Sequence, residues 1–183
     1  MLVGITGTPG TGKTAVTRLL ERKRQYHIIH LNELIRKEGL YSEVDQERDC
    51  VVADMDVVEK RVKELISNSY PVTLLDSHLS HYIADNVIVL RTNPYTLRER
   101  LAKRGYSVEK IEENLDAEAL DVILVESVEW CERVFEIDTT DMSVEETVAI
   151  VDDIVEGLLK DGEQEMHLRY KPGSVDWSEA FFD

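Results

Sequence analysis

Eight consecutive residues near the start of the chain have the composition of a phosphate-binding loop. They read GTPGTGKT from Gly7 to Thr14 and match G-x-x-x-x-G-K-[ST] at every position. Glycines allow successive backbone N–H groups to converge on phosphate oxygens, and a helix that begins near Lys13 adds the positive end of its dipole. The pattern predicts that the Lys13 ammonium contacts the β- and γ-phosphates of a nucleoside triphosphate and that the Thr14 hydroxyl is a ligand of magnesium. A turn that holds no ligand is the alternative.

Asp76 is a candidate second ligand of that magnesium. It ends the apolar run PVTLLD (71–76), which has the length of a buried strand. Neighbouring parallel strands end at the same edge of a sheet, so Asp76 is expected beside the phosphate-binding loop. His78 follows two residues later; it orients a water molecule or contacts a phosphate, or it is an ordinary surface or packing histidine.

The window 91–110 gathers positive charge in a chain whose net charge is −16. Moving a γ-phosphoryl group to a phosphate acceptor brings many negative oxygens together, and cationic side chains offset their repulsion. Arg91 ends a predicted strand on the side of the ligand crevice, while Arg100 and Arg104 share one face of a predicted helix. A solvated helix face with ordinary charges is the alternative interpretation.

A small kinase fits this chain better than other users of triphosphates. The N-K-x-D signature of GTPases is missing from the sequence, and 183 residues are too few for a large motor ATPase. An acceptor monophosphate is already an ionised nucleophile, so the absence of a general base is no objection. The polar stretch after HIIHL (27–31) carries Arg36 on a short predicted helix and is placed to cover such an acceptor.

The elements that must position these residues alternate between strands and helices. Apolar runs predict strands at 2–6, 27–31, 71–76, 86–91 and 133–138. Periodicity and capping signals predict helices at 13–24, 32–39, 54–68, 94–104, 108–130 and 143–160, whereas 41–53 is expected to be a loop. This order predicts an α/β protein of the P-loop NTPase fold, with an open, mostly parallel five-stranded sheet and helices on both faces.

Composition excludes several other classes of protein. The length and a hydrophobic content of 43% are those of one ordinary domain. Cys50 and Cys131 lie far apart and lack the spacing of metal ligands, so neither a zinc site nor a disulfide framework is expected. This use of cysteine predicts a reducing, cytoplasmic setting. No apolar run has the roughly 18 residues of a membrane span, and no leader peptide is expected. The acidic balance disfavours membranes and direct binding to nucleic acid.

The sequence resembles the small adenylate kinases of the isoenzyme-six type from archaea and eukaryotes. The resemblance covers residues 1 to about 160, and an ordered set of segments carries it: ITGTPGTGKT, LYSEVDQERDC, LLDSH, VIVLRT and RERLAKRGYSVEKIEENLDAEAL. It departs from the long adenylate kinases, which have G-K-G-T where this chain has G-K-T-A at 12–15. It implies a core at 1–160 with a monophosphate-binding insert at 30–53 and a lid at 103–113. Residues 161–183 then form a tail, either a mobile end or an aromatic arm folded on the domain.

The same resemblance assigns roles to individual residues. ATP is bound by Gly10, Gly12, Lys13, Thr14 and Ala15 of the phosphate-binding loop and by Arg104 of the KRGY segment. Magnesium and ATP hydrolysis are linked to Asp76 and His78, and Lys13, Asp76, His78 and Arg104 form the catalytic set. The monophosphate is expected to contact His30, Arg36 and Arg91.

Two activities follow from the resemblance. One is a broad nucleoside monophosphate kinase that makes two ADP from ATP and AMP with Mg²⁺. The other is a nucleotide-switched ATPase that acts in late maturation of the small ribosomal subunit and its rRNA, with a small-subunit ribosomal protein as a transient partner. The net charge of −16 is compatible with a basic partner of that kind, although an acidic surface also serves solubility. A protein that binds nucleotide without turnover is a third alternative.

Overall fold

The computed structural model describes residues 1–23, 25–45, 50–66, 69–160 and 162–177, and its main feature is a parallel sheet. In this part of the chain the sheet has five strands in the order β2-β5-β1-β6-β7, and all neighbouring pairs are parallel. The strands are β1 (Leu2–Thr6), β2 (His27–His30), β5 (Thr73–Asp76), β6 (Asn86–Arg91) and β7 (Arg133–Asp138). The predicted open five-stranded parallel sheet is therefore confirmed.

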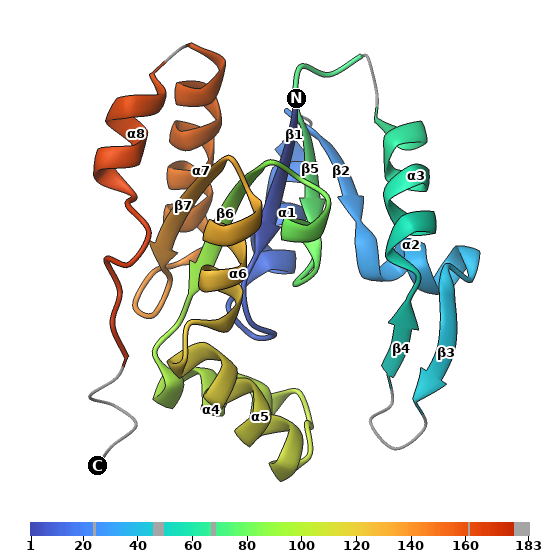
Figure 1. Cartoon of the computed structure of the whole chain (residues 1–183). Helices are drawn as coiled ribbons and strands as arrows, with labels where there is room; N and C mark the ends of the chain where they lie inside the picture. Colours follow the sequence, from blue (N-terminus) through green and yellow to red (C-terminus); the bar gives the residue numbers. More distant parts are fainter. Residues whose placement is uncertain (24, 46–49, 67–68, 161, 178–183) are drawn as a thin grey trace.

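Helices cover both faces of this sheet (Figure 1). On one face α1 (Lys13–Lys23) and α7 (Val144–Leu159) pack on the largest apolar cluster. On the other face lie α2 (Leu31–Glu38), α3 (Met55–Leu65) and α6 (Val122–Trp130). Successive strand residues point to opposite faces, so Leu74 joins the first cluster and Leu75 the second. Both faces of the central strands are buried, which explains why their sequences are continuous apolar runs.

Local capping signals set several helix ends as the sequence predicted. Ser143 and Glu146 form a complete capping box at the start of α7. Gly39 ends α2 with φ 67°, a left-handed conformation that glycine adopts without strain. Asn93 caps α4 (Pro94–Lys103), whose first residue is a proline that needs no N–H partner there. None of the helices in the described ranges is long and apolar enough to cross a membrane.

The predicted loop at 41–53 is wrong, because this segment contains a hairpin. β3 (Tyr41–Asp45) and β4 (Cys50–Ala53) pair antiparallel, and residues 46–49 between them lie outside the described ranges. Val51 and Ala53 pack on the α2–α3 cluster, whereas Val52 between them is exposed. A strand with so few buried residues gives a period-2 pattern that is too short to recognise among its polar neighbours.

The predicted single helix at 108–130 is also wrong, because it breaks into two. α5 (Val108–Ala119) ends before α6 begins, and Asp121 between them has φ 56°. A non-glycine residue rarely adopts this conformation. The Asp121 carboxylate accepts a short hydrogen bond from the buried guanidinium of Arg91, and this contact supplies a tertiary reason for the break that periodicity alone does not contain.

The described part of the C-terminal segment folds against the domain. α8 (Glu163–Arg169) packs on α7, and Met166 enters the main apolar cluster beside Gly157, where a Cβ atom would lie 2.4 Å from the methionine Cγ. The Tyr170 carbonyl then accepts from the backbone N–H of Glu136 in the edge strand β7, at 2.9 Å. Residues 162–177 thus cover the free edge of the sheet, while Phe181 and Phe182 lie outside the described ranges.

Candidate active site

The phosphate-binding loop (residues 7–14) joins the carboxyl end of β1 to α1, at the centre of the sheet. Gly7, Gly10 and Gly12 have φ of 130°, 102° and 105°, which side chains disfavour. A Cβ atom on Gly10 would also lie 2.6 Å from Leu97 Cδ1 of α4. Glycine is therefore required here both by backbone conformation and by the close approach of α4.

Lys13 is buried within this loop. Its Nζ donates to the carbonyl oxygens of Gly7 at 2.6 Å and Thr8 at 3.0 Å. Burial lowers the pKa of Lys13 to about 8, against the opposing effect of the Asp76 and Glu118 carboxylates. The ammonium is thus held at the place where the sequence pattern predicts contact with phosphates, and it stays mainly charged at pH 7.

Asp76 lies beside the loop because of strand register. It pairs with Ile5 of β1 and with His30 of β2, so three strand ends converge there. Its carboxylate accepts from Thr17 Oγ1 at 3.0 Å and is 2.9 Å from His30 Nδ1. Burial alone would raise the pKa of Asp76, but these two hydrogen bonds and the Lys13 cation hold it below its ordinary value. The hydrogen bond to Asp76 in turn raises the pKa of His30.

The oxygen donors beside the loop suit magnesium. Asp76 offers a carboxylate, and Thr14, an exposed residue in the first turn of α1, carries a hydroxyl. Magnesium takes one or two protein carboxylates or hydroxyls together with phosphate oxygens and waters. The described residues include no group of three or more His, Cys, Asp or Glu that could hold a metal without such phosphates. Thr14 and Asp76 therefore fit an ion that arrives with a nucleotide.

His78 follows Asp76 and is half-buried near Lys13. Burial, then the positive charges of Lys13 and His81, lower its pKa to about 4. The imidazole is consequently neutral at pH 7. It can orient a water molecule or accept a hydrogen bond, but it does not supply a positive charge to a phosphate.

Replacing His78 by glutamine should change how stability depends on pH. From the ordinary pKa of 6.5 down to about 4, the unfolded chain binds a proton that the folded chain does not. The stability that neutral His78 contributes is therefore lost as pH falls through this window. We expect the free energy of unfolding of the wild type to decrease relative to His78→Gln between pH 7 and pH 4, measured by urea titration in metal-free buffer. The other histidines are present in both proteins, so their titration cancels in the difference between the two free energies of unfolding. A difference that stays constant from pH 7 to pH 4 would contradict the prediction.

Two predicted arginines of α4 have different surroundings. Arg100 donates to Thr92 Oγ1 at 3.2 Å and to the Thr139 carbonyl at 3.0 Å, which ties α4 to the ends of β6 and β7. Arg104, at the C-terminal cap of α4, is exposed. Its positive charge contributes to the lowered pKa values of both Lys13 and Arg100, so it lies near the loop.

The expected contact of Arg91 with the monophosphate is not supported by its surroundings. Its side chain is only 2% exposed. It donates to Glu118 Oε1 at 2.9 Å and to Glu136 Oε1 at 2.8 Å, and it also pairs with Asp121. A guanidinium whose N–H groups are used by buried carboxylates is a structural centre, so we assign Arg91 no substrate contact.

The remaining predicted residues are spread over three elements, α1, β2 and α2. Ala15 is exposed in the first turn of α1, where its N–H donates to the Gly12 carbonyl at 3.0 Å. His30 is at the end of β2, and Arg36 is exposed on α2. Figure 1 shows the β3–β4 hairpin after α2 and the α4–α5 pair on the side of the sheet to which the strands run.

No role was assigned from the sequence to the side chains of Thr8 and Glu118, which belong to the same region. Thr8 Oγ1 donates to Glu118 Oε2 at 2.5 Å, and both side chains are buried. A weak signal for Glu118 exists: it follows Ile111 and Leu115 at helical spacing on the buried face of α5. A carboxylate at such a position needs buried partners.

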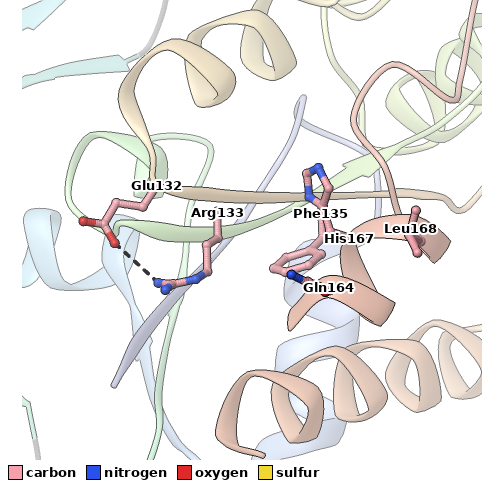
Figure 2. Close-up of a pocket in the computed structure, with 6 residues that line it drawn as sticks. All are labelled: Glu132, Arg133, Phe135, Gln164, His167 and Leu168. Atoms are coloured by element: carbon pink, nitrogen blue, oxygen red, sulfur yellow. Dashed lines mark hydrogen bonds and ion pairs between the residues drawn. The ribbon is translucent and has the colours of Figure 1, made fainter. Parts of the chain in front are cut away.

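A separate cavity lies far from this site along the sheet. It has a volume of about 400 Å³ and lies between β7 and α8 (Figure 2). Glu132 and Arg133 at its wall precede and begin β7, so it is at the amino end of that strand, whereas the phosphate-binding loop follows the carboxyl end of β1. The cavity therefore does not belong to the phosphate site. Its lining residues are Glu132, Arg133, Phe135, Gln164, His167 and Leu168.

The parallel sheet with a complete phosphate-binding loop after its central strand defines a protein of the P-loop NTPase fold. Residues 3–121 match the AAA domain family. A "Putative adenylate kinase" of Methanosarcina barkeri (strain Fusaro / DSM 804) is 57% identical over 178 residues, 97% of each chain. A protein of the same name from Methanocaldococcus jannaschii is 41% identical, over 100% of this chain and 96% of the length of that protein. The chain belongs to this archaeal adenylate kinase family.

Solved structures with low sequence identity share the fold. Shikimate kinase from Bacteroides thetaiotaomicron matches with a TM-score of 0.58 and 18% identity, over 85% of this chain and 98% of its own. A deoxyadenosine kinase from M. mycoides matches with a TM-score of 0.53 and 16% identity, over 86% of this chain and 100% of its own. At these identities the likeness establishes the fold alone.

Proposed function

We propose that this protein transfers the γ-phosphoryl group of ATP to a nucleoside monophosphate, with AMP as an acceptor, in the cytoplasm. The observation that carries the proposal is the buried Lys13 ammonium, held in a complete phosphate-binding loop beside the anionic Asp76. The kinship with archaeal adenylate kinases supports the same acceptor class. No residue has to deprotonate the acceptor, because a monophosphate is already ionised.

On the donor side, each residue has a physical task. Backbone N–H groups of the phosphate-binding loop and the Lys13 ammonium bind phosphate oxygens and hold them in line with the acceptor. Thr14 and Asp76 would hold Mg²⁺, which when bound neutralises charge on the β- and γ-phosphates. Arg104, exposed beside the loop, neutralises negative charge that develops on the transferred group.

On the acceptor side, we propose that residues 30–53 bind the monophosphate and that residues 103–113 act as a lid. The described parts of both segments lie on the side of the sheet where the strands end (Figure 1). Arg36 on α2 is exposed and makes no ion pair with the other described residues, so its guanidinium is available to an anionic acceptor. His30, with a raised pKa beside Asp76, is a second candidate contact.

Arg36→Ala should weaken the binding of AMP without affecting that of ATP. We expect the KM for AMP to rise about tenfold, the effect of one lost charge-assisted contact, with the KM for ATP unchanged. Lys37→Ala removes the adjacent exposed positive charge of the same helix and is the matched control. Initial-rate kinetics with each nucleotide varied in turn measures both constants. Equal changes in the two variants, or in the two KM values, would contradict an acceptor role for Arg36.

We also propose ATP hydrolysis that serves maturation of the small ribosomal subunit. The neutral, half-buried His78 next to Asp76 is suited to orient an attacking water. The net charge of −16 favours a basic partner such as a ribosomal protein of that subunit. This role predicts release of free phosphate that rises when the ribosomal protein is added, whereas the kinase role alone predicts stimulation by AMP.

A further inference from the structure

The carboxylate of Glu118 connects two parts of the molecule that are distant in sequence. Glu118 is near the end of α5 and is 2% exposed. Its Oε2 accepts from Thr8 Oγ1 of the phosphate-binding loop at 2.5 Å. Its Oε1 accepts from Arg91 Nε and from the backbone N–H of Thr92, both at 2.9 Å. Both carboxylate oxygens are therefore engaged.

Thr8 in turn contacts Lys13 through its backbone carbonyl. The Thr8 carbonyl accepts from Lys13 Nζ at 3.0 Å, and from the N–H and hydroxyl of Thr11 at 3.2 and 3.0 Å. Its hydroxyl is anchored to Glu118, so the orientation of its peptide depends on that anchor. A shift of Thr8 would move the carbonyl that holds the Lys13 ammonium.

The anchor itself is held in place by buried charges. Arg91 donates through Nη2 to the Glu118 carbonyl at 2.9 Å and through Nη1 to Glu136 Oε1 at 2.8 Å. Glu136 Oε2 in turn accepts from the backbone N–H groups of Ser174 and Val175, at 2.8 and 3.2 Å. Hydrogen bonds to charged groups are strong in a buried setting, so Glu118 cannot move without breaking several of them.

We infer that Glu118 is a positioning residue for the phosphate-binding loop, acting through Thr8 on Lys13. The inference rests on the proposed function, since it concerns the nucleotide site. α5 begins at Val108, within the segment proposed as a lid, so the same contact links the lid helix to the loop. A purely structural role for Glu118 would stabilise the fold without affecting how the folded protein binds ATP.

The hydroxyl of Thr8 provides the cleanest test. Thr8→Val removes the donor and leaves Glu118 paired with Arg91, while Thr8→Ser keeps the hydroxyl and is the matched control. We expect Thr8→Val to raise the Kd for Mg-ATP and the KM for ATP about tenfold. Thr8→Ser should keep both constants within about twofold of the wild-type values. Titration calorimetry at a temperature where each variant is folded gives the Kd.

Glu118→Gln provides a second variant that should fold, because Arg91 keeps the carboxylates of Glu136 and Asp121. It replaces the anionic acceptor of the Thr8 hydroxyl with a neutral amide and should raise the Kd for ATP. In the Thr8→Val background it should add almost nothing, since both changes remove the same hydroxyl-to-carboxylate hydrogen bond. Wild-type Kd in both single variants would overturn the inference and leave the proposed function intact. A Kd for ATP in the double variant that is raised by the product of the two single effects would also overturn it. A wild type that binds no ATP would overturn both.

Discussion

Lys13→Ala is expected to lower kcat/KM for phosphoryl transfer by at least about 10³-fold, because its ammonium is the buried cation of the phosphate-binding loop. The fold should survive the change. Burial lowers the pKa of Lys13 to about 8, so keeping its ammonium charged in the folded chain at pH 7 costs free energy of folding. The variant should therefore melt no lower than the wild type, by circular dichroism.

Lys23→Ala is the matched control for this variant, because it removes an exposed lysine from the last turn of the same helix. It should keep wild-type rates. Phosphoryl transfer by Lys13→Ala at more than about a tenth of the wild-type rate would contradict the assignment of the loop.

Arg104→Ala is expected to lower kcat about 10²-fold while the KM for ATP changes little, because a cation that acts on developing charge matters most in the transition state. The side chain is exposed, so the free energy of unfolding should stay within about 0.5 kcal/mol of the wild type. Steady-state kinetics and urea titration measure the two effects separately.

Lys103→Ala, the neighbouring exposed lysine of α4, is the control for charge alone. Its kcat should change less than about threefold if the effect of Arg104 depends on its position beside the loop. Equal losses of kcat in the two variants would show that the general positive charge of this helix is sufficient, and would remove Arg104 from the catalytic set.

Local patterns were enough to predict the phosphate-binding loop and its setting. The loop, the strand that precedes it and the helix that follows it occupy adjacent residues, so one short segment contains all the information. Asp76 was placed correctly beside the loop because parallel strands end at a common edge, and its register with Ile5 confirms that position.

Arg91 shows where such reasoning fails. Its charge and its place at a strand end favoured a substrate contact, but Glu118, Asp121 and Glu136 converge on it from α5, the α5–α6 junction and β7. No local pattern encodes this convergence. The same cluster explains why the segment 108–130 is not one helix, because Asp121 leaves helical geometry where it contacts Arg91.

Helix α8 was missed for a related reason. The segment 163–169 is short and mostly polar, so its helical periodicity is weak. From this segment Met166 enters the main apolar cluster. The helix depends on its contact with Gly157 of α7, a glycine that leaves room for the methionine side chain. Tertiary contacts of this kind determine short helices more than propensity does.

The most direct test of the account is a phosphorus-31 NMR time course of the wild-type protein with ATP, Mg²⁺ and AMP, because one spectrum counts both ADP and free phosphate. We predict two ADP formed for each AMP consumed, at a rate that greatly exceeds the release of free phosphate in a parallel sample without AMP. Release of phosphate at the same rate with and without AMP, and no loss of AMP, would contradict it.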